Sequence, residues 1–449
     1  MDQQFDLVVI GTGVAGSTVA KQCRTAGWEV AIIDSRPFGG TCALRGCNPK
    51  KVLVEMAELV DWNRRMEGRG ISGQQVHIDW QAMTRFQKTF TEPIPAKREQ
   101  EYMEAGIAMF HGPACFAGEN AVQVGGDRLS GRYILVATGA TPATLGIPGE
   151  EHLTTSDQFL ELETLPARIV FVGGGYISLE SAHTCVRAGV QVQILHEKAQ
   201  LLENFDPDLV ACLTRATREA GIDVHLNTAV KGIEKSGCLV VHTSSDGRKQ
   251  TFEADLVVHG ASRMPNTAGL ELEKAGVKYE KKGITVNEYL QSVSNPAVYA
   301  AGDVVDTPGA QLTPVAAMDA HVVARNLLEG NHHKPDYSLV PSVVFTVPRL
   351  SMVGLLEEAA LEQGFKFETC YQDASDWNSP RQVGIKHSAF KLLLEAGSRR
   401  ILGAHLLGHH AEEVINVFAI AMRAGLSADD IQQTLYGYPT GASDIIKML

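Results

Sequence analysis

Two cysteines with the spacing of a redox pair stand close together in this sequence. Cys42 and Cys47 are separated by four residues and follow a pair of glycines. A bridge that closes so short a loop removes little entropy from the unfolded chain, so as a structural crosslink it would contribute little stability. An ideal helix rises about 7.5 Å over five residues, whereas the Cα atoms joined by a disulfide usually lie within about 6.8 Å of each other. Gly46 and Pro49 permit the distorted turn that closes the pair, and we predict a redox-active disulfide.

The composition limits the compartment and the partners. The 449-residue chain has a net charge of −12 and eight cysteines, six of which are scattered. Scattered thiols do not form a disulfide framework in a chain of this size, so we interpret these six as small buried apolar residues. The negative charge opposes binding to nucleic acid or to anionic membranes. Because the sequence lacks both a bilayer-length apolar run and a basic signal-like start, we expect a cytoplasmic protein of two to four domains.

A glycine-rich loop follows the first apolar run. Residues 6–10 are typical of a buried strand, and a G-x-G-x-x-G pattern with Gly11, Gly13 and Gly16 comes directly after them. A helical stretch and a second apolar run then end at Asp34. This βαβ pattern predicts a dinucleotide site, in which the glycines let the backbone approach a pyrophosphate and the acid binds a ribose.

The same pattern occurs again further along the chain. An apolar run at residues 169–172 leads into Gly173 and Gly175, and a second apolar run follows at 192–195. Ser178 takes the place of the third glycine, and its small side chain still permits close packing of helix and strand. Two such units predict one bound redox cofactor and one exchangeable nicotinamide.

Other segments predict regular structure or boundaries. We expect a charged helix, two buried strands that end in glycine turns, a domain boundary, two later strands and an apolar helix. In that order they are residues 96–105, 133–140, 298–304, 329–337, 342–346, 391–394 and 412–422.

Five side chains of metal-ligand type lie close together near the C-terminal helix, but Gly408 interrupts the helical spacing that ligands would need. We interpret them as a solvated helix start whose carboxylates favour the N-terminal helix dipole, and we predict no metal site. The five are His405, His409, His410, Glu412 and Glu413.

Motifs along nearly the whole chain resemble those of the class I flavoprotein disulfide reductases, which include glutathione reductase, dihydrolipoamide dehydrogenase and mercuric reductase. The resemblance rests on residues 39–51, the two glycine loops, and residues 137–139, 262–266, 301–303 and 312–316. It implies an α/β fold with two Rossmann-like domains and an α+β C-terminal dimerisation domain. The implied parts are an FAD-binding domain at 1–150, an NAD(P)H-binding domain at 151–265, a central region at 266–335 that completes the FAD domain, and a dimerisation domain at 336–449.

The resemblance also implies residue roles. Cys47 would contact the flavin, and Cys42 would be the outer thiol that attacks the acceptor. Lys50 would lie near the flavin ring and pair with Glu180, while Tyr176 would cover the nicotinamide pocket. The implied FAD-binding residues are Gly11, Gly13, Gly16, Asp34, Thr41, Lys50, Ala114, Gly139, Asp303 and Thr313. The implied nicotinamide-binding residues are Gly173, Gly175, Tyr176, Glu180, Glu197 and Arg263. A homodimer is implied, in which the C-terminal segment of the other subunit completes the active site.

Four positions depart from the disulfide-reducing members of that family. Tyr438 and Ser443 stand where those members carry a catalytic His-Glu pair. A phenol with a reference pKa near ~10 does not cycle protons near neutrality as an imidazole does, so ordinary disulfide reduction should be impaired. In this respect the segment resembles mercuric reductase, which has a tyrosine at the same position. Lys21 and His321 occupy the positions of the arginines that hold glutathione, and neither offers a bidentate clamp.

We expect NADH to be preferred over NADPH as the coenzyme. Glu197 and Glu203 correspond to the two arginines that grip the 2′-phosphate of NADPH in the related enzymes. Carboxylates there would repel the phosphate, which disfavours NADPH. His196 occupies the place where NADH enzymes usually carry a glutamate, so Glu197 could serve in its stead.

The sequence therefore predicts an FAD enzyme that passes electrons from NAD(P)H, with NADH favoured, through the flavin and the Cys42–Cys47 pair to a small-molecule acceptor. Metal ions, quinones and thiol or disulfide compounds are the acceptor classes considered. One alternative is a disulfide reductase of the glutathione reductase or dihydrolipoamide dehydrogenase type. An alternative of a different class is a redox-sensing flavoprotein without efficient turnover.

Overall fold

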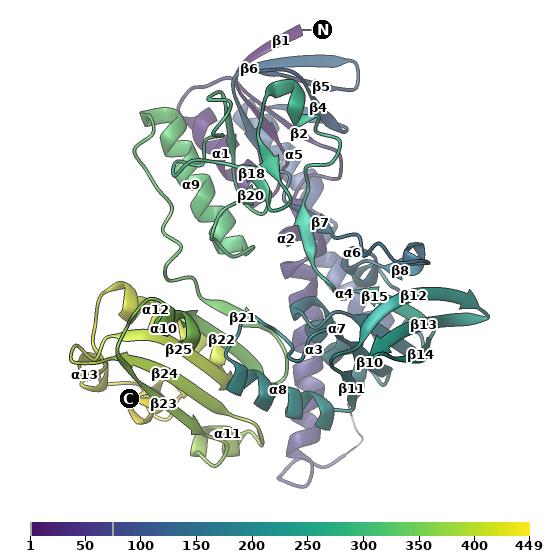
Figure 1. Cartoon of the computed structure of the whole chain (residues 1–449), viewed down its shortest axis with the longest axis vertical. Coiled ribbons are helices and arrows are strands. Elements are labelled where there is room, and N and C mark those ends of the chain that lie inside the picture. Colours follow the sequence, from purple (N-terminus) through teal and green to yellow (C-terminus); the bar gives the residue numbers. More distant parts are fainter. Residues whose placement is uncertain (1, 74–75) are drawn as a thin grey trace. The chain divides into compact units, whose positions relative to one another are not determined.

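The computed structural model describes residues 2–73 and 76–449, and Figure 1 traces its helices and strands. Contacts group the chain into two compact units. The first comprises residues 1–50, 85–143 and 262–337, and the second comprises 51–84, 144–261 and 338–449. Helices α3 (Cys47–Met66) and α4 (Trp80–Thr91) each supply residues to both units. Within the described ranges, no helix combines the length and the apolar character needed to cross a membrane.

A seven-stranded sheet forms the centre of the first unit. Its strands are β1 (Asp2–Ile10), β2 (Val30–Asp34), β3 (Ala108–His111), β4 (Ala114–Gly118), β5 (Ala121–Val124), β6 (Asp127–Val136) and β19 (Val298–Ala300). The order is β3-β2-β1-β6-β5-β4, and β19 also pairs with β6. Strands β1, β2, β3, β6 and β19 are parallel, whereas β4 and β5 pair in antiparallel fashion.

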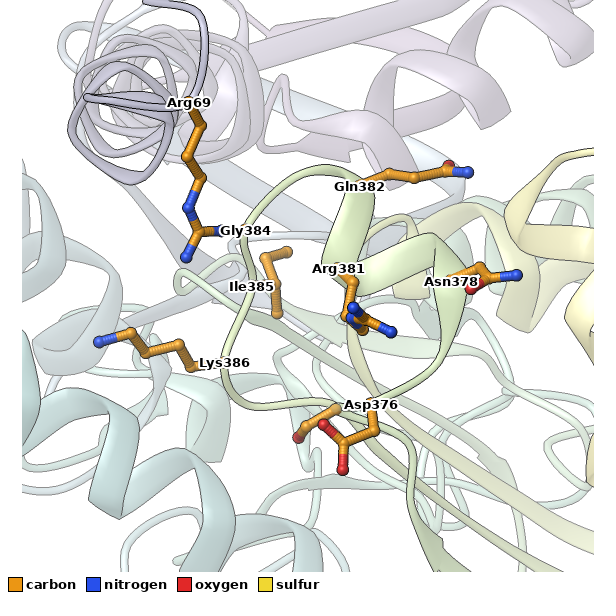
Figure 2. A pocket seen from close by; sticks show the side chains of 9 residues that line it. Arg69, Asp376, Asn378, Arg381, Gln382, Gly384, Ile385 and Lys386 are labelled. Carbon is orange, nitrogen blue, oxygen red and sulfur yellow. The ribbon is translucent and has the colours of Figure 1, made fainter.

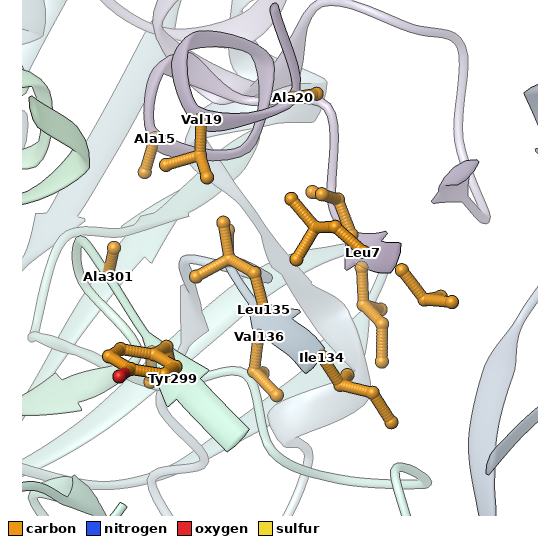
Figure 3. Packing of buried hydrophobic residues seen from close by; sticks show 14 of the residues in the cluster. Leu7, Ala15, Val19, Ala20, Ile134, Leu135, Val136, Tyr299 and Ala301 are labelled. Carbon is orange, nitrogen blue, oxygen red and sulfur yellow. The ribbon is translucent and has the colours of Figure 1, made fainter. Parts of the chain in front are cut away.

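Helices cover this sheet and bury its central strands. Residues 7–10 of β1 are at most 4% exposed, which explains why they form a continuous apolar run and not an alternating one. Helix α1 (Val14–Thr25) packs against α9 (Thr313–Glu329). In Figure 3, Ala15 and Val19 of α1 point toward Leu135 of β6.

Smaller elements complete the first unit. Helices α2 (Gly40–Arg45) and α5 (Ile94–Ala105) lie there, together with the short helix η2 (Leu272–Ala275). Strand β7 (Ala140–Pro142) pairs with β16 (Arg263–Pro265). A third sheet contains β17 (Tyr279–Glu280), β18 (Gly283–Thr285) and β20 (Val305–Asp306).

The second unit contains its own parallel sheet, with strands β8 (Leu153–Thr154), β9 (Arg168–Val172), β10 (Gln191–Leu195), β11 (Ile222–His225) and β15 (Leu256–His259). Its order is β11-β10-β9-β15-β8. The helices of this region are η1 (Glu150–His152), α6 (Ser156–Leu160), α7 (Tyr176–Arg187) and α8 (Pro207–Glu219). An antiparallel sheet of β12 (Ala229–Ser236), β13 (Cys238–Ser245) and β14 (Arg248–Ala254) lies between β11 and β15 in the chain.

The C-terminal part of the second unit is an antiparallel sheet with helices. Its strands, in the order β21-β22-β25-β24-β23, are β21 (Ser342–Val344), β22 (Arg349–Gly354), β25 (Ile401–Gly408), β24 (Ala389–Glu395) and β23 (Phe367–Asp373). Helix α12 (Ala411–Arg423) packs on β22 and β25 and buries Ile415 and Phe418. The shorter helices are α10 (Glu357–Glu362), α11 (Asn378–Gln382), α13 (Ala428–Gln432), η3 (Gly441–Asp444) and α14 (Ile445–Met448).

The predicted α/β fold with two Rossmann-like regions and an α+β C-terminal region is confirmed. One expected strand is shorter than predicted. The strand at 342–346 ends at Val344, because the next amide, Phe345 N–H, donates to a side chain and not to a strand. In the segments 133–140 and 298–304 the strands end at Val136 and Ala300, and the expected glycine turns follow with a φ of +70° at Gly139 and +75° at Gly302. The predicted boundaries after residues 150, 265 and 335 stay predictions.

The expectation that five side chains of metal-ligand type form a solvated helix start is wrong for two of them. His405 lies in β25, is 1% exposed, and has its Nε2 3.1 Å from the Leu355 carbonyl oxygen. Glu412, predicted to be solvated, has a side chain that is only 10% exposed and pairs with Arg349. Arg349 also pairs with Glu55 and Glu58 of α3, so this guanidinium holds three carboxylates. The reason is tertiary: α12 begins against β22, and the start of the helix therefore faces a cation instead of water. Within the described residues, no group of three or more His, Cys, Asp or Glu side chains is arranged to hold a metal ion.

A buried ammonium joins helix α8 to strand β24. The Lys391 side chain is 4% exposed, and its Nζ lies 2.9 Å from Asp206, 2.5 Å from Asp208 and 3.3 Å from Glu357. Asp206 is fully buried and caps α8 by accepting hydrogen bonds from the Asp208 and Leu209 amides at 3.1 and 3.2 Å. Burying charges is costly unless they are paired, so the cation and the cap depend on each other.

Replacing Lys391 with methionine should lower the free energy of unfolding by about 3–5 kcal/mol, because it leaves the Asp206 carboxylate buried without its cation. The midpoint of urea unfolding measures this loss. The matched control is Lys366→Met, an exposed lysine, which should change stability by no more than about 0.5 kcal/mol. Adding Asp206→Asn, which preserves the cap, should restore part of the loss. A Lys391→Met variant as stable as the parent protein would contradict this account.

Candidate active site

The first glycine loop is shaped by close backbone contacts. Gly11 has a φ of +110°, and a Cβ there would collide with the Ala137 carbonyl oxygen. A Cβ on Gly16 would collide in turn with the Gly11 carbonyl oxygen. Gly13 is the N-cap of α1, and among the described residues no side chain caps this helix. The first amides of α1 are therefore available to a pyrophosphate, which fits a bound dinucleotide.

Asp34 at the end of β2 is tied to this loop. Its Oδ2 accepts hydrogen bonds from the Thr12 amide at 2.9 Å and the Thr12 hydroxyl at 2.6 Å, and Oδ1 accepts from the Arg36 amide at 3.0 Å. Thr12 Oγ1 in turn accepts from the Gly39 amide at 3.1 Å. A carboxylate has further lone pairs for a ribose hydroxyl. Sequence reasoning missed Thr12, although its hydroxyl between two fingerprint glycines was a visible signal.

A second carboxylate fits the hydroxyl-rich part of a cofactor. Asp303 follows the turn at Gly302, and no donor from the described part of the chain hydrogen-bonds its carboxylate. Burial raises the pKa of Asp303, while the positive charge of Arg263 acts in the opposite direction. The turn is held from behind by Asp319, which accepts from the Gly302 amide at 3.2 Å and from the Tyr337 hydroxyl at 2.7 Å. Sequence reasoning missed Asp319, whose signal was an acid in the apolar helix α9.

The two cysteines lie at a break between helices. Cys42 is in α2, Cys47 begins α3, and Gly46 separates the two helices. Both cysteines are thiols in this structure. Cys47 Sγ lies 3.4 Å from the hydroxyl oxygen of Thr313, the first residue of α9. The predicted distortion is therefore present as a helix break.

The two thiols differ in acidity. The pKa of Cys47 is lowered to about 6, first by a hydrogen bond from Cys42 and then by the Thr313 hydroxyl and the charge of Lys50, against the opposing effect of burial. The same hydrogen bond, together with burial, raises the pKa of Cys42. The thiolate therefore resides on Cys47 at neutral pH, and Cys42 donates to it.

The second glycine loop has the same construction in the second unit. Gly173 has a φ of +104°, and a Cβ there would be 2.5 Å from the Gly260 carbonyl oxygen. Gly175 is the N-cap of α7, again without a side-chain cap in the described structure. Ser178 is fully buried, and a Cβ on Gly260 would collide with its hydroxyl. The third glycine of the fingerprint is thus replaced by a serine that packs against a glycine elsewhere.

The predicted nicotinamide-site residues differ from one another in exposure and in hydrogen-bond partners. Glu180 is 3% exposed, and its Oε1 accepts a hydrogen bond from the Phe345 amide at 2.8 Å. Tyr176 is 46% exposed at the start of α7. Arg263 belongs to the first unit, where it donates to the Ala140 carbonyl oxygen at 2.6 Å. Whether Glu180 pairs with Lys50 stays a prediction.

The coenzyme-selecting loop follows β10. Glu197 and Glu203 are exposed there. His196 has its Nε2 2.8 Å from the Gln200 carbonyl oxygen and 3.8 Å from the Glu203 carboxylate. This loop therefore carries two exposed carboxylates, together with the exposed Lys198, and no arginine stands at residues 196–206.

Lys21 and His321, at the positions predicted to correspond to glutathione-binding arginines, contact other side chains of this chain. Lys21 pairs with Glu101 at 2.5 Å, and Glu101 is also held by Arg98 at 2.8 Å. The side-chain amide nitrogen of Gln22, Nε2, lies 2.7 Å from His321 Nδ1. The Lys21 ammonium thus shares the Glu101 carboxylate with Arg98 within the first unit.

The C-terminal segment carries the tyrosine that replaces histidine. Tyr438 is 82% exposed in this chain. Ser443 does not serve as a base next to it: its amide and hydroxyl are bonded to Thr440 in a capping box.

The remaining predicted FAD-binding residues all belong to the first unit, as do the two cysteines. Thr41 lies in α2, Ala114 begins β4, and Gly139 turns the chain after β6 with a φ of +70°. Apart from Arg263, the predicted nicotinamide-site residues belong to the second unit.

A pocket of about 660 Å³ lies elsewhere in the second unit (Figure 2). Arg69, Arg381 and Lys386 line it together with Asp376, and none of the predicted cofactor residues does. In Figure 2 the Arg69 and Lys386 side chains lie on one side of the loop at Gly384 and Ile385, and Arg381 points away from them toward Asp376. These cations do not converge on one point.

Comparisons with known proteins identify the family. Residues 5–320 match the pyridine nucleotide-disulphide oxidoreductase family, and residues 340–449 match its dimerisation domain, which indicates a homodimer. A mercuric reductase of Staphylococcus aureus is 31% identical over 99% of this chain and 82% of its own length. A glutathione reductase of Burkholderia cepacia is 32% identical over 99% of this chain and 98% of its own length. A mercuric reductase of Streptomyces lividans is 32% identical over 98% and 94%.

The two glycine loops, together with an Asp303 carboxylate that no described donor hydrogen-bonds, fit FAD and a nicotinamide nucleotide as the two dinucleotides of this family. The chain belongs to the pyridine nucleotide-disulphide oxidoreductases and is an NAD(P)H-dependent flavoprotein oxidoreductase.

Proposed function

We propose that this enzyme takes electrons from NADH and delivers them through the Cys42–Cys47 pair to a small-molecule acceptor that needs no strong general acid. Soft metal ions, quinones and thiol compounds of low pKa belong to this class. FAD, when bound, relays two electrons between the nicotinamide and the disulfide. The observation that carries the proposal is the asymmetric thiol pair, in which Cys47 holds the thiolate and Cys42 the proton.

The proton count follows from this asymmetry. A hydride equivalent brings two electrons and one proton, which break the S–S bond and leave one thiol and one thiolate. The lowered pKa of Cys47 assigns the thiolate to that residue at neutral pH, and its neighbours stabilise it. Before Cys42 attacks an acceptor, its proton must pass to Cys47 along their shared hydrogen bond. Lys50 and Thr313 hold the negative charge until then.

Two observations support an acceptor other than glutathione disulfide. Lys21 is paired with Glu101, and its ammonium does not offer the bidentate clamp that a guanidinium gives to a substrate carboxylate. Tyr438 and Ser443 replace an acid–base pair, and Ser443 is engaged in a helix cap. The high exposure of Tyr438 in the single chain supports the further proposal that this segment reaches the acceptor site of the other subunit in the homodimer.

The thiolate of Cys47 should form with a midpoint near pH 6. Because the pKa is lowered, the thiolate is present above this pH and is lost as the pH falls through it. The rate of alkylation of Cys47 by iodoacetamide, followed by mass spectrometry of the reduced protein, reports the midpoint.

Cys42→Ala should move that midpoint up toward the usual value of about 8.5, since it removes the first of the lowering hydrogen bonds. Cys42→Ser, which retains a donor, is the matched control and should stay nearer to 6. Equal midpoints in the two variants would contradict the assignment.

The unmodified enzyme should have a higher kcat/KM with NADH than with NADPH, because two carboxylates face the place of the 2′-phosphate. Glu197→Arg combined with Glu203→Arg should raise kcat/KM for NADPH, by about tenfold or more if each new guanidinium contributes a charge-assisted hydrogen bond. Steady-state kinetics with both coenzymes test this. A preference of the unmodified enzyme for NADPH would overturn our interpretation of the loop.

Glutathione disulfide and lipoamide should be poor substrates. General acid–base catalysis is typically worth about 10²–10⁴-fold, so the missing histidine should be evident in kcat. Tyr438→His combined with Ser443→Glu should restore part of the rate with a small uncharged disulfide, which avoids the absent carboxylate clamp. Efficient turnover of either natural disulfide by the unmodified enzyme would return the chain to the ordinary disulfide reductases.

A further inference from the structure

The loop between β21 and β22, residues 345–348, is tied to helix α7 at two points. The Phe345 amide donates to Glu180 Oε1 at 2.8 Å, and the Val347 amide donates to His183 Nδ1 at 3.2 Å. The two acceptors stand about one turn apart on α7, and alternate amides of the loop reach them. Both belong to the second unit, so the contact joins the nicotinamide-site helix to the C-terminal sheet.

The proton on the His183 ring is assigned by its neighbours. The Thr217 hydroxyl uses its single proton to donate to the Leu213 carbonyl oxygen at 2.8 Å. It can therefore only accept from His183 Nε2, which lies 3.0 Å away. Nε2 carries the hydrogen, and Nδ1 presents a lone pair to the Val347 amide. The ring is 1% exposed, and burial followed by the charge of Arg187 lowers its pKa well below the usual value, so it stays neutral.

The ring and the loop are both held by other buried contacts. Arg187 Nη1 donates to the His183 carbonyl oxygen at 3.0 Å and lies 3.3 Å from His183 Nδ1, so this guanidinium is a second donor at that ring nitrogen. Arg187 Nη2 donates to Asp61 at 2.7 Å. The Thr346 hydroxyl donates to the Pro348 carbonyl oxygen at 2.7 Å, and Thr346 is fully buried. The hydrogen bond from the Val347 amide to His183 Nδ1 is thus one of three hydrogen bonds that constrain the loop. No motif of the sequence pointed to His183.

We propose that His183 is a positioning residue for Glu180: by accepting from the Val347 amide, it holds the loop so that the Phe345 amide orients the Glu180 carboxylate. This rests on the proposed function, in which electrons come from NADH, and on the expectation that Glu180 belongs to the nicotinamide site. Loss of the acceptor at Nδ1 would leave a buried amide without a partner, and the loop would move to find another. Glu180 would then lose the hydrogen bond that fixes one of its oxygens.

Four variants distinguish a positioning role of His183 from a general contribution of its side chain to packing. His183→Leu fills the space but offers no acceptor. His183→Gln offers an amide oxygen to Val347 and is the conservative rescue. Thr217→Val removes the acceptor of the ring N–H and permits the other tautomer, which would turn a hydrogen toward the Val347 amide. Thr214→Val is the matched control, because Thr214 lies on the same helix and donates to the Val210 carbonyl oxygen at 2.8 Å without contacting His183.

The first measurement is amide hydrogen exchange of residues 340–350 in the FAD-loaded protein without coenzyme. His183→Leu should speed exchange of the Phe345 and Val347 amides by about tenfold or more, since a lost buried hydrogen bond weakens protection by that order. Thr217→Val should speed it to a smaller extent. His183→Gln and Thr214→Val should match the parent protein. This readout does not depend on turnover.

The second measurement is the anaerobic reduction of bound flavin by saturating NADH. His183→Leu should lower the limiting rate constant about 5- to 20-fold while the apparent Kd for NADH changes less than about twofold. In a Glu180→Gln background the same substitution should add less than about a twofold effect, because nothing remains to be positioned.

The proposal is overturned if His183→Leu has its full effect in both backgrounds, or if His183→Gln restores neither measurement. Should His183→Leu fail to fold, the comparison of Thr217→Val with Thr214→Val decides: indistinguishable exchange and reduction rates would overturn the proposal. If the parent flavin is reduced by neither NADH nor NADPH, the proposed function fails instead, and the exchange data still report whether His183 holds the loop.

Discussion

The parallel register of the first sheet is the constraint on which the cofactor side of this enzyme depends. Ile10 pairs with Ile33 and with Val136, and Val136 also pairs with Ala300. The chain segments that follow these strands therefore leave the sheet at one edge, and they carry the glycine loop, Asp34, the turn toward Gly139 and the Gly302–Asp303 turn. Backbones approach there so closely that a side chain at Gly11 would strike the neighbouring strand's end. Four segments far apart in the sequence thus meet at this edge of the sheet, where the residues predicted to bind FAD lie.

Three acids near the predicted sites are held by backbone amides. Asp34 accepts from the amides of Thr12 and Arg36, Asp319 from that of Gly302, and Glu180 from that of Phe345. Burying an ionised carboxylate without donors costs several kcal/mol, so these amides stabilise the charge as well as fix its direction. They also couple distant segments, because each amide belongs to a loop whose shape the carboxylate then determines. At these positions the same hydrogen bond orients the carboxylate and fixes the shape of the loop that supplies the amide.

The sequence alone determined the features that are local. Glycine spacing after an apolar run predicted both dinucleotide loops, because close backbone approach leaves room only for residues without a Cβ. The spacing of Cys42 and Cys47 around Gly46 predicted a redox pair with a distorted turn, and the structure breaks the helix there. Ordered motifs along the chain predicted the family and hence the fold class. Each of these signals lies within a few residues, where sequence spacing maps directly onto geometry.

Only the tertiary structure decided the partners of polar side chains. Glu412 was predicted to be solvated, yet it pairs with Arg349, a residue 63 positions away. His183 carried no motif, and its role depends on a loop 164 positions away and on the hydroxyl proton of Thr217. Ser178 replaces a fingerprint glycine because its packing partner, Gly260, supplies the missing space. Hydrogen-bond donors and free volume are properties of neighbours in space, so no local pattern in the sequence specifies them.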